Sequence, residues 1–226
     1  MTEESEWTDP RAAALTHLAA YRDLPDRAAK HTWALGRALA RSLRSAPPRF
    51  VLEVAHELFA ASDWKGHAWI LLSLHKGSFA LLDEAEVEAF GQGIGSWGSV
   101  DGYARLVAGP AWLRGQIPDA TIHRWARSED RWWRRAALVS TVALNVRSHG
   151  GFGDVSRTLE VCHMMLDDHD DMVVKAMSWA LRELVVHDPD AVWAFMREHD
   201  DALATRVKRE VRNKLTTGLK NPKSTA

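Results

Sequence analysis

The sequence predicts an all-α protein built from consecutive helix pairs, and three observations support that prediction. Apolar residues recur at helical spacing through most of the chain, as in Val173, Val174, Met177, Leu181 and Leu184. Prolines stand where such patterns begin, and proline suits the first turn of a helix because its missing N–H is not needed there. No stretch combines alternating polarity with the β-branched residues that are typical of strands.

The first half of the chain is expected to hold six helices, at about 10–22, 26–45, 48–61, 64–76, 84–95 and 97–108. Asp9-Pro10 and Pro47-Pro48 mark two of the starts. Gly77 and Gly109 mark ends or turns. Short loops are therefore expected between these helices.

The second half is expected to hold six more helices, at about 119–127, 130–146, 154–166, 170–186, 190–199 and 203–216. Pro118-Asp119 and Asp188-Pro189 mark starts, and Gly150-Gly151 marks a turn. The segment that begins at Asp130 resembles the segment that begins at Asp170, forty positions later. Both begin with acidic residues, followed by two apolar residues and then a basic residue followed by alanine. This spacing is the period of HEAT and armadillo units, in which each helix pair buries one face against its neighbours and the stack forms a curved solenoid.

The length and composition fit one globular domain over residues 1–226, with disordered tails at 1–9 and 217–226. The single cysteine, Cys162, has no partner for an internal disulfide, which favours a reducing compartment. The start MTEESEW is acidic and unlike a signal peptide, and no apolar run is long enough to span a membrane. We therefore expect a cytoplasmic protein with no membrane contact.

The charges are segregated although the formal net charge is only −1. Three segments are rich in Lys and Arg, namely 24–49, 124–135 and 204–223. Such segregation allows a basic face on a neutral protein. The alternative is that these charges lie on ordinary solvated helix faces.

Eleven tryptophans are a high number for this length, and most are expected to pack in the core. Trp97 precedes Asp101 by four residues, so the two share one face of a helix. Trp132 and Trp133 precede two arginines at a helix start, and Trp179 lies in a mixed apolar and basic helix. The tryptophans that we interpret as structural are Trp64, Trp69, Trp112, Trp125 and Trp193.

Three segments together resemble the AlkD-type DNA alkylation repair glycosylases in residue type, order and separation. They are Trp97–Asp101, Trp132–Ala137, and Lys175–Glu183 followed by Asp188–Trp193. Lys208-Arg209-Glu210 in a basic helix also fits, and the resemblance covers about residues 64–214. It implies a right-handed solenoid of HEAT-like antiparallel helix pairs with a concave, basic face for duplex DNA. The implied activity is base excision repair, in which N3- and N7-alkylated purines are removed without flipping the base.

The resemblance also implies roles for individual residues. Asp101 matches the catalytic carboxylate, and Trp97 and Trp179 match aromatic walls against the deoxyribose. Arg135 matches the residue that holds the DNA backbone near the lesion, with Arg134 in its place if the alignment shifts by one. The further basic residues that we expect at the DNA are Arg131, Lys175, Arg182, Lys208, Arg209, Arg212 and Lys214. We expect a monomer near the bacterial nucleoid, with no metal or cofactor.

The chemistry of an alkylated purine fits such a site. The base already carries positive charge, so its glycosidic bond is weak, and the sugar becomes cationic as the bond breaks. A carboxylate beside the sugar stabilises this charge and can orient water. The face of an indole ring stabilises a nearby cation by about 0.5–2 kcal/mol. One carboxylate and two aromatic walls therefore suffice to promote cleavage of this glycosidic bond.

Two departures from the family pattern concern lesion size. The segment 24–58 does not reproduce the family's aromatic lesion contact, and Arg27 and His31 occupy roughly that region. Gly98 stands where a larger residue is expected between Trp97 and Asp101. A roomier site would admit bulky minor-groove adducts, which is a hypothesis.

Simpler interpretations exist for each site residue. Asp101 fits a surface or capping role, and Trp97 and Trp179 fit core packing. Arg135 fits a surface salt bridge with Glu129 or Asp130.

Two rival functions also remain open. A non-catalytic scaffold that binds nucleic acid or protein is the main one, because repeat folds often bind. The pairs Glu53/His56 and Glu160/His163 have the spacing of a di-iron bundle, although such pairs arise often by chance.

Overall fold

A computed structural model describes residues 7–222, in which every regular element is helical and no strand occurs. The predicted all-α, solenoid-like class is therefore confirmed. Contacts divide the chain into two compact units, Met1–Gln92 and Gly93–Ala226. The single domain remains a prediction, and each unit is described by itself.

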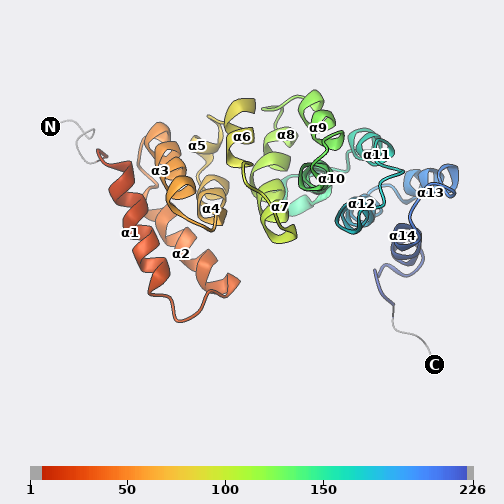
Figure 1. The fold of residues 1–226 in the computed structure, drawn as a ribbon, viewed down its shortest axis with the longest axis horizontal. Coiled ribbons are helices and arrows are strands. Elements are labelled where there is room, and N and C mark those ends of the chain that lie inside the picture. Colours follow the sequence, from red (N-terminus) through yellow and green to blue (C-terminus); the bar gives the residue numbers. More distant parts are fainter. Residues whose placement is uncertain (1–6, 223–226) are drawn as a thin grey trace. The chain divides into compact units, whose positions relative to one another are not determined.

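The first unit contains helices α1 (Pro10–Arg22), α2 (Ala29–Ser42), α3 (Pro48–Ala61), α4 (Gly66–Leu74), α5 (Lys76–Phe79) and α6 (Glu84–Phe90). Helix α1 packs on α3, and α2 packs on α4, as can be followed at the red and orange end of the ribbon (Figure 1). The predicted start of α3 at Pro48 and its end at Ala61 are both confirmed. Burial of its apolar face, with Val51, Val54 and Leu58 fully covered, is what holds it in place.

A pair of buried histidines joins α1 to α4. His17 Nε2 lies 3.0 Å from His67 Nδ1, and both residues are almost fully buried. Burial lowers the pKa of His17 to about 4, and burial together with the neighbouring His17 lowers the pKa of His67 to about 4. Both rings are therefore neutral at pH 7, so that one nitrogen can donate and the other accept.

The second unit contains α7 (Trp97–Tyr103), the π-helical turn η2 (Ala104–Ala108), α8 (Gly109–Leu113), α9 (Asp119–Ala126), α10 (Arg131–Asn145), the 3₁₀ turn η3 (Arg147–His149), α11 (Val155–His163), α12 (Asp171–Leu184), α13 (Pro189–Glu198) and α14 (Thr205–Thr217). Helix α10 is the centre of this unit, because α7, α8, α9, α11 and α12 all pack against it (Figure 1). Helix α14 packs on α12.

The two segments of the predicted forty-residue repeat begin equivalent helices. Asp130 caps α10 by accepting from the Trp132 N–H, and Asp170 caps α12 by accepting from the Met172 N–H. An aspartate at this position satisfies a backbone donor that the helix itself leaves unpaired. The repeated acidic residues thus mark helix starts, and the helices that follow them pack side by side.

The observed helix bounds differ from the expected ones in a few places. The expected helix at 26–45 is shorter at both ends, and α5 was not expected as a separate element. The expected helix at 97–108 continues through a π turn as far as Leu113. Of the tails, residues 1–6 and 223–226 lie outside the described residues, whereas the Trp7 ring lies 5.6 Å from that of Phe50.

Cys162 is buried, and burial raises the pKa of its thiol. Among residues 7–222, no helix has both the length and the apolar character that crossing a membrane requires.

Candidate active site

Helix α7 presents Trp97 and Asp101 on one face, one turn apart. Its start is fixed by a capping box, in which Ser96 accepts from the Ser99 N–H and Ser99 accepts from the Ser96 N–H. Trp97 occupies the first helical position and is 64% exposed, so the core-packing interpretation of this residue is wrong. A large exposed indole beside a carboxylate is available to a ligand.

Asp101 forms a two-pronged ion pair with Arg135 of α10. The Arg135 Nε donates to Asp101 Oδ1 and Nη2 donates to Oδ2, both at 2.9 Å. The third guanidinium nitrogen, Nη1, donates to the Met172 carbonyl at 2.5 Å, at the start of α12. The Asp101 side chain is 19% exposed and that of Arg135 is 6% exposed. Asp101 therefore neither caps a helix nor lies free on the surface, and the partner of Arg135 is Asp101 and not Glu129 or Asp130.

Two opposing effects act on the Asp101 carboxyl. Burial raises its pKa above the ordinary value, because water no longer solvates the charged form. The charge and hydrogen bonds of Arg135, and the charge of Arg105, act in the lowering direction without cancelling the effect of burial. The group is thus a desolvated carboxylate that a fixed cation holds in one orientation.

The π turn after α7 brings a further cation to the site. Pro110 has no N–H and its ring crowds the preceding turn, and here the Gly109 N–H reaches Ala104 O, five residues back. Arg105 stands in this widened turn and is exposed. Its guanidinium carbon lies 5.7 Å from the centre of the Trp179 ring, so η2 and α12 meet through a cation–π contact.

Trp179 is half-buried and its indole is oriented from its own helix. The Trp179 Nε1–H donates to Glu183 Oε1 at 2.9 Å, one turn further along α12. Arg105 therefore connects Trp179 to the carboxylate, since it lies over the Trp179 ring and its charge acts on Asp101. Arg105 and Glu183 were not singled out by sequence reasoning. The only signal in the sequence was their spacing of four residues from Asp101 and Trp179.

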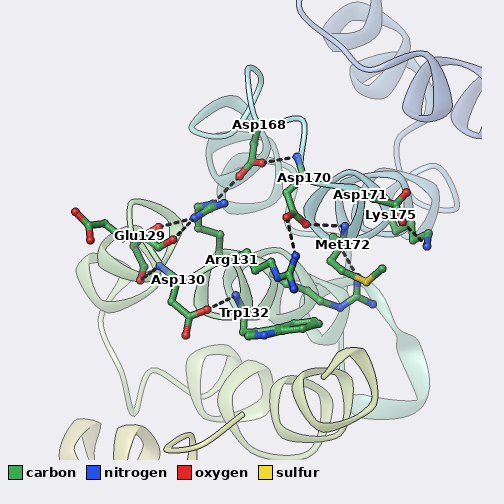
Figure 2. Close-up of polar contacts among 12 residues, drawn as sticks. Glu129, Asp130, Arg131, Trp132, Asp168, Asp170, Asp171, Met172 and Lys175 are labelled. Atoms are coloured by element: carbon green, nitrogen blue, oxygen red, sulfur yellow. Dashed lines mark hydrogen bonds and ion pairs between the residues drawn. The ribbon is translucent and has the colours of Figure 1, made fainter. Parts of the chain in front are cut away.

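Arg134 and Arg131, which were also predicted to contact DNA, are tied to acidic residues. Arg134 Nε donates to Asp168 Oδ2 at 2.6 Å, while its Nη1 donates to the Ser128 and Glu129 carbonyls. Figure 2 shows Asp170 contacting Arg131 while also capping the Met172 N–H. Arg131 lies over the Trp132 ring, 4.9 Å from its centre.

The remaining predicted DNA contacts lie on α12 and α14. Lys175 pairs with Asp171, Lys208 with Asp200, and Arg209 with Glu210. Arg182 donates to Ser178 Oγ, and burial lowers its pKa against the raising effect of Glu210 and Glu183. Lys214 donates to the Gly218 carbonyl, and Arg212 is exposed without an ion-pair partner within residues 7–222.

The tryptophans interpreted as structural are only partly so. Trp69, Trp112 and Trp125 are buried, and Trp193 is half-buried. Trp64 is exposed and stacks on Tyr21 in the first unit.

The Glu-x-x-His residues do not converge on a metal site. His56 pairs with Glu86, and Glu160 pairs with His123. Over the described part of the chain, no group of three or more His, Cys, Asp or Glu side chains is arranged to hold a metal.

The fold and this surface define an all-helical, solenoid-like protein with a desolvated carboxylate near one exposed and one half-buried indole. A sequence model of the family described as DNA alkylation repair enzyme matches residues 35–215, and the chain belongs to that family. No curated protein matches the chain in sequence. The solved structure of a predicted DNA alkylation repair enzyme from Enterococcus faecalis is 18% identical, with a TM-score of 0.65 over 84% of this chain and 87% of that chain. At this identity the likeness establishes the fold.

Proposed function

We propose that the protein is a DNA glycosylase that hydrolyses the N-glycosidic bond of cationic N3- and N7-alkylated purines in duplex DNA. The observation that carries the proposal is the Asp101 carboxylate, which Arg135 holds in place next to an exposed Trp97. A carboxylate fixed in this way stabilises positive charge as it develops on the sugar, without first having to reorganise.

The proposal assigns a role to each residue of the site. In it, Asp101 faces the sugar and orients the attacking water, and Trp97 and Trp179 lie against the deoxyribose. Arg135 is a positioning residue in this proposal, because its donors are engaged by Asp101 and the Met172 carbonyl. Its predicted contact with the DNA backbone would have to be made by other cations. Since Trp97 is largely exposed and Asp101 partly so, the sugar can be approached without flipping the base.

Base release from duplex DNA treated with a methylating agent tests the proposal. Asp101→Asn removes the negative charge and keeps an acceptor for Arg135, so base release is expected to fall by about 100-fold or more while DNA binding is retained. Asp167→Asn is the control, because Asp167 is an exposed aspartate of the same unit. If the wild type and Asp101→Asn release bases at equal rates, Asp101 is not the catalytic carboxylate. No release by either protein favours a non-catalytic scaffold.

A further inference from the structure

The first unit carries a hollow whose charged lining is entirely cationic. It has a volume of about 430 Å³ and lies between the end of α2 and the junction of α4 with α5. Its lining residues are Arg37, Ala40, Arg41, Arg44, Leu74, His75, Lys76 and Gly77. No acidic residue is among them.

The cations of this hollow differ from those of the predicted DNA surface in the second unit. Six of the nine basic residues predicted there form ion pairs with acidic residues. By contrast, Arg37, Arg41, Arg44 and Lys76 have no hydrogen-bond or ion-pair partner for their side chains among residues 7–222, and all four are exposed. Their charge is therefore not neutralised locally, and it favours an anionic ligand.

The spacing of these cations suits a row of phosphates. Arg37 and Arg41 lie one turn apart on α2, and Arg44 follows just after its end, so the row is about 10 Å long at 1.5 Å per residue. One DNA strand places a phosphate about every 3.4 Å along the axis, so the row spans about three phosphates. The lining offers Ala40 and Leu74 but no Trp, Tyr or Phe on which a base could stack.

We propose that this hollow binds the phosphodiester backbone of duplex DNA, independently of sequence and of damage. Three guanidiniums and one ammonium neutralise consecutive phosphates and release their counterions. The inference rests on DNA as the partner, as in the proposed function, and does not depend on the catalytic role of Asp101.

The test is the salt dependence of binding to an undamaged duplex, measured by fluorescence anisotropy with the full chain. The variant Arg37→Gln/Arg41→Gln/Arg44→Gln is compared with Arg11→Gln/Arg22→Gln/Arg49→Gln, which removes the same charge from α1 and α3. Each phosphate contact contributes about 0.9 to the slope of log K against log salt. The slope of the variant Arg37→Gln/Arg41→Gln/Arg44→Gln, called the α2 variant below, is therefore expected to be smaller in magnitude than that of the wild type by about 2.7. The slope of the control is expected to change much less.

Equal slopes for the two triple variants, or an unchanged slope in the α2 variant, overturn the proposal. If the triple variant does not fold, Arg41→Gln alone is expected to lower the slope by about 0.9. Base release under saturating protein serves as the second measurement, and the α2 variant is expected to keep the wild-type rate there. One further outcome separates the two proposals. If the triple variant of α2 loses binding to undamaged DNA and the wild type releases no base, the phosphate-binding proposal stands and the glycosylase proposal is refuted.

Discussion

Asp101 and Arg135, 34 positions apart in sequence, face each other across α7 and α10 with two parallel hydrogen bonds. The same guanidinium also holds the first turn of α12 through the Met172 carbonyl. One arginine therefore fixes the carboxylate relative to the helix that carries Trp179. Because both partners are largely buried, removal of either one leaves an uncompensated charge or donor, which costs about 3 kcal/mol.

The pH dependence of base release is expected to report on Asp101. The carboxylate must be ionised to stabilise a cationic sugar, and burial raises its pKa above the ordinary aspartate value. Activity should therefore fall on acidification at a pH above that at which an exposed aspartate titrates. Single-turnover rates from pH 4 to pH 8, corrected for spontaneous depurination, measure this. Arg135 lowers the pKa of Asp101, so Arg135→Met should move the acidic fall in activity to higher pH. An unchanged pH profile in this variant would contradict the influence of Arg135 on the Asp101 carboxyl.

Trp97 is expected to affect activity but not stability. Replacement by alanine removes an exposed indole, so the free energy of unfolding should change by less than about 0.5 kcal/mol. Loss of a cation–π contribution of about 0.5–2 kcal/mol corresponds to about a 2-fold to 30-fold slower base release. Phe152→Ala is the matched control, since Phe152 is 66% exposed in the same unit. A similar slowing in both variants would argue against a specific role for Trp97.

Two glycines on the same continuous helix should respond to alanine in opposite directions. A Cβ on Gly109 would lie 2.7 Å from both Ala143 Cβ and Ser140 O of α10, whereas a Cβ on Gly98 would meet nothing within 4 Å. Gly109→Ala is thus expected to destabilise the protein by about 1–3 kcal/mol. Gly98→Ala is expected to stabilise it by about 0.5 kcal/mol through helix propensity. Denaturant unfolding measures both, and a destabilising Gly98→Ala would contradict the open position of this residue.

The buried histidine pair should make the first unit sensitive to acid. His17 and His67 have pKa values of about 4 in the folded protein and about 6.5 when unfolded, so the unfolded state binds more protons below pH 6.5. Their contribution to stability is present above pH 6.5 and is lost as the pH falls towards 4, by about 3 kcal/mol per histidine.

Chemical denaturation at several pH values tests this dependence. His17→Gln should reduce it to roughly half, because glutamine hydrogen-bonds without titrating whereas the buried His67 still titrates. The control His169→Gln replaces an exposed histidine of the other unit and should leave the dependence unchanged. An equally steep loss of stability in His17→Gln would exclude the pair as its cause.

Sequence reasoning anticipated the helices because their signals are local. Pro48 and the apolar spacing after it define α3, and Asp130 and Asp170 mark the starts of α10 and α12. The partner of Arg135 was missed, because a contact between helices depends on packing that no local pattern encodes. Arg105 was missed for a different reason. The π turn alters the helical phase after Asp101, so a regular 3.6-residue period does not describe this segment.

The π turn over Ala104–Ala108 amounts to one residue more than a regular α-helix would contain. If the same residues formed a regular α-helix instead, the part before the turn would be rotated by about 100° relative to Gly109. Either the Asp101 carboxylate would then turn away from Arg135, or Gly109 would lose its close fit to α10. The wide turn that holds the extra residue therefore lets one continuous helix meet both orientation requirements, the pairing of Asp101 with Arg135 and the fit of Gly109 to α10. A regular helix of this sequence could meet only one of them.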